Sequence, residues 1–156
     1  MDDIDRRILI GLQNDGRQTN ANLAKSVGLS PSAMLARIRR LEDQGCIRGY
    51  RAIIDPASLD LGLQALIAIQ ARHSTNALAT FERGIMGVQG VRACYRISGT
   101  YDYMLHVARR DLTQLGLMTK HKIAAIEGVG RIETMLVLTE VISDVGWPIV
   151  TEELTD

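Results

Sequence analysis

The sequence has few cysteines and histidines, and those it has are scattered. Cys46 and Cys94 are the two cysteines among 156 residues, and they lie too far apart for a CxxC or metal-ligand spacing. We expect them to be buried small side chains of a protein kept in a reducing compartment. His73, His106 and His121 show no spacing typical of a metal site or of a Ser/His/Asp triad. No catalytic residue and no metal ligand is therefore predicted.

Long hydrophobic runs and a signal-peptide core are also missing. No apolar stretch reaches the length that crosses a bilayer, and the first residues, MDDIDRR, are charged. Hydrophobic residues still make up 46% of the chain, which is enough for a packed core and argues against disorder. The glycines at 84, 87 and 90 lack the strand-to-helix setting of a phosphate-binding loop. The expected location is cytoplasmic, in association with the nucleoid.

Net charge is absent too, but the charges are unevenly distributed. Across the chain, 18 Lys and Arg residues balance 18 Asp and Glu residues. Residues 1–51 carry nine basic and six acidic side chains, whereas residues 52–156 carry nine basic and twelve acidic ones. A basic N-terminal part followed by an acidic remainder predicts two domains with different partners.

The stretch Asn20–Gly45 predicts two helices joined by a tight turn. Gly28 follows the first helix, at a position where helices often end in a left-handed conformation. Ser30 is a hydroxyl N-cap, and Pro31 occupies the first helical position, where its missing N–H is not needed. A helix over residues 3–12 completes a three-helix domain. The second helix of the pair has an apolar face made of Met34, Ile38 and Leu41.

The opposite face of this helix combines small side chains with arginines, as recognition helices of helix-turn-helix domains do. Small residues allow close approach to the major groove, and arginines bind phosphates or guanine edges. A structural three-helix bundle with a solvated basic face is the alternative. The turn chemistry and the spacing favour double-stranded DNA as the partner. The residues predicted to bind DNA are Arg17, Asn20, Lys25, Ser30, Ser32, Ala33, Ala36, Arg37, Arg39 and Arg40.

The remaining chain alternates between strand and helix patterns. Residues 46–55 have the β-branched content of one or two short wing strands, and a hinge is expected around residues 57–62. Helices are predicted after a cap at Ser74 or Thr75 and after Asp111. Strands are predicted at residues 63–72, 91–98, 101–109 and 130–141, with a short one at 149–151.

The β-α-β-β-α-β order of the second part predicts an α+β fold, a ferredoxin-like sandwich with both helices on one face of an antiparallel sheet. The predicted domains are a winged helix-turn-helix at 1–51, a linker strand and hinge at 52–62, and the sandwich at 63–156. The other face of the sheet needs a cover, and a second subunit is the simplest one, so we expect a dimer or a larger assembly. The residues of that face are Leu66, Ala68, Met104, Ala108, Met135 and Val137.

The chain resembles the Lrp/AsnC family, the leucine-responsive or feast/famine transcriptional regulators. The resemblance covers nearly the whole chain, and the order of its motifs is more specific than any single motif. It implies a winged helix-turn-helix, a linker strand and an effector-sensing sandwich, in dimers that assemble into octamers of four dimers. The motifs are D-x-x-D-x-x-I-L at 2–9, DGR at 15–17, GLSPS at 28–32, RIRRLEDQGCIRGY at 37–50, SGTYDYML at 98–105 and EGVGRIETMLVLTEV at 127–141.

The resemblance also implies an effector site for an amino acid or a related metabolite, at an interface between dimers. The family's site lies around the turn between the second and third sandwich strands. Asp102 can hold an α-ammonium group, and backbone N–H groups near Gly99 can hold a carboxylate. A plain tight turn with a capping Asp is the alternative, and no cofactor is predicted. The predicted effector-binding residues are Gly99, Thr100, Tyr101, Asp102, Tyr103, Thr134 and Leu136.

The predicted function is a sequence-specific DNA-binding transcriptional regulator, not an enzyme, whose assembly or DNA occupancy responds to an amino acid. One alternative is a sirohaem-decarboxylase-like enzyme on the same fold, which would use His106 beside Arg109 and Arg110 to hold the carboxylates of a tetrapyrrole. Another alternative is an architectural protein that compacts DNA.

Overall fold

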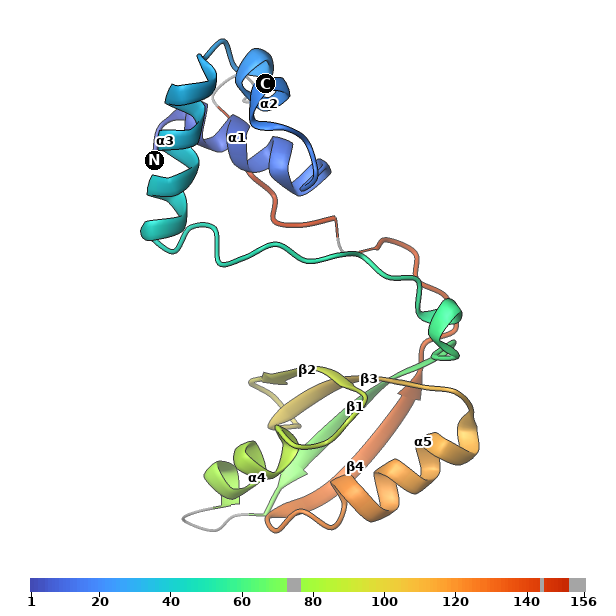
Figure 1. The fold of residues 1–156 in the computed structure, drawn as a ribbon. Helices are drawn as coiled ribbons and strands as arrows, with labels where there is room; N and C mark the ends of the chain where they lie inside the picture. The colour runs from blue at the N-terminus through green and yellow to red at the C-terminus, as the bar shows by residue number, and fades with distance from the viewer. Residues whose placement is uncertain (73–76, 144, 152–156) are drawn as a thin grey trace. The chain divides into compact units, whose positions relative to one another are not determined.

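The structure is a computed structural model that describes residues 1–72, 77–143 and 145–151. The chain divides into two compact units. Figure 1 shows the fold, coloured by residue number from the N-terminus to the C-terminus. Residues 1–53 and the C-terminal segment from Val141 form the first unit, and residues 54–140 form the second. The predicted sandwich domain extends to residue 156, whereas this division groups the segment from Val141 with the first unit.

The first unit contains three helices that share one core. They are α1 (Asp3–Asn14), α2 (Asn20–Ser26) and α3 (Pro31–Asp43). Gly28 has a φ of +73° in the turn before α3, and the Ser30 side chain accepts a hydrogen bond from the Ala33 N–H. The predicted helix-turn-helix is confirmed. Its core consists of Ile8, Leu23, Ala24, Met34, Ile38 and Leu41.

The second unit is a four-stranded antiparallel sheet with the strand order β2-β3-β1-β4. Its strands are β1 (Leu63–Ala71), β2 (Val91–Arg96), β3 (Tyr103–Arg109) and β4 (Val129–Leu136). Its helices are α4 (Ala77–Ile85) and α5 (Leu112–Met118), with a 3-10 turn at Pro56–Leu59 and a π-helical turn at Thr119–Ile123. The predicted ferredoxin-like order is confirmed.

Both helices of this unit pack on the same face of the sheet. Phe81 of α4 and Leu115 of α5 share a core with Ile67 and Leu105 of the two central strands. Side chains alternate between the faces of a strand, so the neighbouring positions belong to the opposite face. That face carries apolar side chains from β1, β3 and β4: Leu66, Ala68, Met104, Ala108 and Met135.

Several local predictions are wrong. Residues 46–55 and 149–151 form no strand, and the last strand ends at Leu136 instead of continuing to residue 141. A strand requires a partner for its backbone N–H and C=O groups, and the sheet formed by the described residues contains only the four strands named above. The helix cap predicted at residue 74 or 75 lies outside the described residues.

The cysteine prediction is also wrong, because Cys46 and Cys94 are both exposed. Cys46 follows the end of α3, and Cys94 lies on β2, which is an edge strand of the sheet. No helix within the described ranges is long and apolar enough to span a membrane.

Candidate nucleic-acid interface and effector site

The outer side of α3 presents small and cationic side chains. Ser32, Ala36, Arg39 and Arg40 are exposed, whereas Ala33 and Arg37 are half-buried. This side begins at the N-terminal end of α3, the part of a recognition helix that contacts base edges. The other residues predicted to bind DNA, namely Arg17, Asn20, Lys25 and Ser30, are exposed as well.

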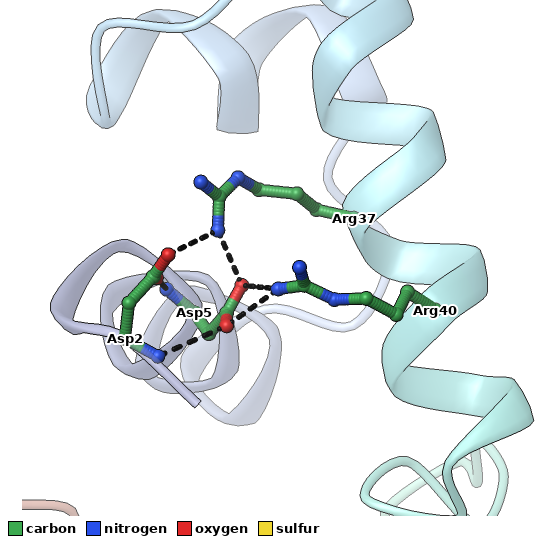
Figure 2. A network of polar contacts seen from close by, with 4 residues as sticks. All are labelled: Asp2, Asp5, Arg37 and Arg40. Carbon is green, nitrogen blue, oxygen red and sulfur yellow. Dashed lines mark hydrogen bonds and ion pairs between the residues drawn. The ribbon is translucent and has the colours of Figure 1, made fainter.

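Two arginines of α3 are held by carboxylates at the start of α1, as Figure 2 shows. Arg37 Nη1 donates to Asp2 Oδ2 at 2.7 Å and to Asp5 Oδ1 at 2.8 Å. Arg40 Nη2 donates to both Asp5 oxygens, at 2.7 and 2.6 Å. The Asp5 side chain is 1% exposed, so the negative charge that it brings into the unit is matched by these arginines.

The same carboxylates start α1 by a reciprocal capping arrangement. The Asp2 side chain accepts from the Asp5 N–H, and the Asp5 side chain accepts from the Asp2 N–H. The hydrogen bond from Arg37 is the main cause that lowers the pKa of Asp2 from 3.8 to about 2. The pairing therefore fixes the start of α1 against the recognition helix.

The pairing changes how Arg37 and Arg40 can meet DNA. Each uses a single Nη atom for its carboxylate partners, and their side chains are 24% and 48% exposed. Their predicted contacts with DNA stay predictions, to be made by the remaining nitrogens. Arg39 differs, because it is exposed and makes no hydrogen bond or ion pair with the described residues.

In the second unit, Asp102 lies in the turn between β2 and β3 and bonds the end of the central strand β1. Its Oδ2 accepts from the Ala71 N–H at 2.7 Å, and its own N–H donates to the Ile69 carbonyl at 2.9 Å. The register of β1 against β4 shifts between Ile69 and Ala71, so the carboxylate bonds an N–H at this irregularity. Asp102 thus has a structural bond whether or not its charge also meets a ligand.

The two tyrosines of this turn have different surroundings. Tyr103 is 1% exposed, its ring centroid lies 4.5 Å from that of Phe81, and its hydroxyl donates to Glu82. Burial is the main cause that raises the pKa of Tyr103 to about 12. Its side chain belongs to the core, and the predicted contact of Tyr103 with an effector stays a prediction. Tyr101 donates to Glu133, and the Arg131 guanidinium lies 5.7 Å from its ring centroid.

Thr134 and Leu136 line an open pocket of about 350 Å³ between α5 and β4. They pair with Ile67 and Ala65 of β1, so they share the helix-covered face of the sheet. The other lining residues are Leu112, Leu115, Gly116, Thr119, Lys120 and Ala124. This lining is mostly apolar and carries one cationic side chain, Lys120.

One chain does not bring the predicted effector residues together. Thr134 and Leu136 lie on the face of the sheet that the helices cover. Glu133, which accepts a hydrogen bond from Tyr101, lies on the opposite face, because side chains alternate along a strand. The predicted effector residues therefore stay predictions, divided between the two faces of the sheet. No group of three or more potential metal-ligating side chains occurs in the part of the chain that the structure describes.

Comparison with known proteins identifies both units. Residues 1–48 match a winged helix-turn-helix DNA-binding domain, and residues 64–147 match the Lrp/AsnC ligand binding domain. The chain belongs to the Lrp/AsnC family. The predicted recognition is confirmed, and the family is one of transcriptional regulators.

Curated and solved relatives cover nearly all of this Lrp/AsnC chain. The leucine-responsive regulatory protein of Escherichia coli is 36% identical over 142 residues, which are 90% of this chain and 87% of that protein. A transcriptional regulator from Neisseria meningitidis, solved in complex with L-methionine, has a TM-score of 0.92 and 33% identity, over 95% of this chain and 96% of the other. An AsnC-family regulator from Agrobacterium tumefaciens gives 0.88 and 32%, over 95% and 97%. None of these matches supports the sirohaem-decarboxylase alternative.

Sequence reasoning about this Lrp/AsnC regulator missed two features of the sites. It did not place Asp2 and Asp5 against Arg37 and Arg40. The three-residue spacing of the acids was the available signal, since it is that of a capping box. It also missed Lys120, which no local pattern distinguishes from a solvated lysine.

Proposed function

We propose that this Lrp/AsnC regulator binds specific sites on double-stranded DNA through the outer side of α3, and that an amino acid changes its assembly or its occupancy of DNA. The exposed small and cationic side of α3 carries the proposal. Ser32, Ala33 and Ala36 enter the major groove, and Arg39 binds a phosphate beside it. The peripheral contacts to phosphates come from Arg17, Asn20, Lys25 and Ser30, together with the remaining nitrogens of Arg37 and Arg40.

We further propose that the regulator forms dimers, and octamers of four dimers. The apolar face of the sheet opposite the helices supports this, with Met135 on it 38% exposed. The linker supports it as well, because Ile53 and Ile54 are 91% and 59% exposed in a segment whose β-branched sequence favours a strand. A second copy of the linker would give this segment the strand partner that it lacks in one chain.

The effector site is proposed to combine the turn of one chain with the pocket of another. The pocket is apolar and is large enough for an amino-acid side chain, since ligand pockets start at about 300 Å³. Asp102 would hold the ammonium group, and the backbone N–H groups near Gly99 and Thr100 would bind the ligand carboxylate. Lys120 would add a positive charge for that carboxylate. The L-methionine bound to the Neisseria meningitidis relative supports an amino acid with an apolar side chain.

A ligand screen followed by DNA binding tests this proposal. Each of the twenty amino acids is added in a thermal-shift assay, because a ligand that binds only the folded state raises the melting temperature. The best ligand is then added to mobility-shift reactions on DNA selected from a random library, and to light-scattering measurements. The proposal requires selected DNA to bind more tightly than random DNA, and at least one amino acid to change binding or assembly.

Replacement of Arg39 by alanine should weaken binding to all DNA sequences alike. Arg39 is exposed and unpaired within the described residues, so its loss removes a phosphate contact. The slope of the logarithm of the DNA-binding constant against the logarithm of the salt concentration should then shrink by about 1. Mobility shifts at two salt concentrations measure this, and the melting temperature should stay unchanged. An Arg39→Ala protein with wild-type affinity at both concentrations would remove Arg39 from the interface.

Arg37→Ala is the informative comparison for Arg39→Ala. It should weaken specific binding by about 1–3 kcal/mol if Arg37 reads a base. It also removes a partner of the buried Asp5, so its melting temperature should fall as well. Loss of stability without loss of affinity would assign Arg37 a purely structural role.

Replacement of Asp102 by asparagine should weaken amino-acid binding by about 1.5–3 kcal/mol, the range for hydrogen bonds to charged groups. The asparagine oxygen can still accept from the Ala71 N–H, so the substitution removes the charge and keeps the turn. Calorimetric titration with the best amino acid of the screen measures the effect, and DNA affinity without ligand should stay the same. Asp60→Asn is the matched control, since Asp60 has a left-handed φ of 55° that asparagine tolerates.

Equal amino-acid affinities of the wild type and Asp102→Asn would exclude Asp102 as the holder of the ammonium group. A change of oligomeric state in Asp102→Asn, with unchanged Asp60→Asn, would instead assign the carboxylate to the structure of the turn.

A further inference from the structure

A segment near the C-terminal end of the described chain contacts α1. Gln13, in the last turn of this helix, forms two hydrogen bonds with the backbone of Trp147, which is 134 positions later in the sequence. Its Nε2 donates to the Trp147 carbonyl at 3.0 Å, and its Oε1 accepts from the Trp147 N–H at 2.7 Å. The side-chain amide therefore satisfies both backbone groups of one residue, as a neighbouring strand would.

The residue before Trp147 has a backbone conformation that allows this contact. Gly146 has a φ of +90°, and a Cβ at this position would lie 2.6 Å from Gln13 Oε1. Glycine is thus required by both its conformation and its close approach to the glutamine. Farther along, Thr151 is only 6% exposed. The Trp147 side chain itself is 78% exposed, so the contact depends on specific backbone bonds and not on burial of the indole ring.

We propose that residues 145–151 form a docking strap that Gln13 holds against α1, so that the DNA-binding unit is attached to the effector-binding domain at two points of the chain. The first attachment is the linker after α3. The second is the strap, which follows β4 in the sequence after residues 137–144.

The strap gives the effector site a short covalent route to the recognition helix. Thr134 and Leu136 of the pocket lie on β4, β4 leads into the strap, and the strap binds α1. The start of α1 is in turn bound to α3 through Asp5 and its arginines. A ligand that shifts β4 would then bias docking of the strap and with it the position of α3. This coupling rests on the proposed function, whereas the docking itself does not.

The docking can be measured in the full-length protein without any ligand. Trp147 is the one tryptophan in the sequence, so its fluorescence anisotropy reports the mobility of the strap. Hydrogen exchange measured by mass spectrometry reports protection of the peptide that contains the Trp147 N–H. Gln13→Ala removes both hydrogen bonds. Gly146→Ala adds a Cβ that would collide with the Gln13 side-chain amide and so prevents the same contact. Asn14→Ala is the control, since it changes the neighbouring residue at the same end of α1.

Both strap variants should exchange deuterium in the C-terminal peptide at least about fivefold faster than the wild type, because two hydrogen bonds are lost. The Trp147 anisotropy should fall in both, while Asn14→Ala should behave as the wild type. Wild-type exchange and anisotropy in Gln13→Ala and Gly146→Ala would overturn the strap. Loss of protection in the wild type on dilution to the monomer would overturn docking within one chain, since the segment would then be held by a second copy.

A second measurement tests the coupling. Affinity for the selected DNA is compared in the wild type and Gln13→Ala, with L-methionine and with the best amino acid of the screen as probes. A smaller ligand-induced change in Gln13→Ala than in Asn14→Ala supports the route through the strap, and an equal change excludes it. Failure of the wild type to bind DNA would refute the proposed function but leave the exchange result on docking intact.

Discussion

Replacement of Asp5 by asparagine is expected to lower the free energy of unfolding of the DNA-binding unit by about 3 kcal/mol, because it removes one partner of a buried ion pair. Asp5 is 1% exposed and accepts from the Asp2 N–H, from Arg37 and twice from Arg40. Asparagine offers one acceptor oxygen, and its NH2 group would face donors. The arginines are 24% and 48% exposed and can be partly rehydrated, which keeps the expected cost at the low end for such pairs.

The two units need not unfold together, so the measurement has to resolve the first unit from the second. Scanning calorimetry together with hydrogen exchange of the α1 and α3 peptides does this. The matched control is Asp3→Asn on the same helix. Asp3 pairs with Arg7 at 3.1 Å one turn along α1, with the two side chains 34% and 38% exposed. Such i, i+4 helix pairs contribute about 0.5 kcal/mol or less. Similar small effects of Asp5→Asn and Asp3→Asn would show that the buried carboxylate does not hold α1 against α3.

Replacement of Ala36 by glutamate is expected to reduce DNA affinity about 100-fold, which corresponds to about 2.7 kcal/mol. Ala36 is exposed in the middle of the side of α3 that is proposed to enter the major groove. A carboxylate there would be repelled by the phosphates and would lose water without gaining a partner. It would also lie one turn before Arg40 and could pair with that arginine, which takes further positive charge from the interface.

Fluorescence anisotropy of labelled DNA, at two salt concentrations, measures the loss. Glutamate is nearly as good a helix former as alanine, so the melting temperature should change little. Ala79→Glu is the control, because it places the same exposed substitution on α4 of the other unit. Wild-type affinity of Ala36→Glu would mean that this side of α3 does not face DNA.

The sequence alone determined the elements and their order. Gly28, Ser30 and Pro31 lie within a few residues of one another and act through a left-handed turn and a helix cap. The start of α3 can therefore be predicted from the local sequence. The alternating and helical patterns after residue 63 likewise fixed the β-α-β-β-α-β order, since each reports which face of an element is buried. The family resemblance located the turn at residues 99–103 as a candidate effector site.

Strand ends and solvent exposure required the tertiary structure. The apolar pattern continues to residue 141, but β4 ends at Leu136, and the last backbone hydrogen bond that the described residues make at this end runs from the Val137 N–H to the Gln64 carbonyl of β1. Periodicity reports only what a residue prefers, whereas a strand also needs a neighbour to bond its backbone. The same reason explains why the linker has a strand-like sequence and no strand in the single chain.

Only the tertiary structure decided which polar side chains meet. The spacing of the arginines predicted the basic face of α3. It did not predict that Arg37 and Arg40 pair with Asp5, an acid more than 30 positions earlier. Gln13 and Trp147 are farther apart still, and Asp102 bonds the backbone of another strand. Local patterns record burial and capping, which depend on near neighbours along the chain. A hydrogen bond between distant residues depends on where packing of the core places two backbones, and no spacing in the sequence encodes that position.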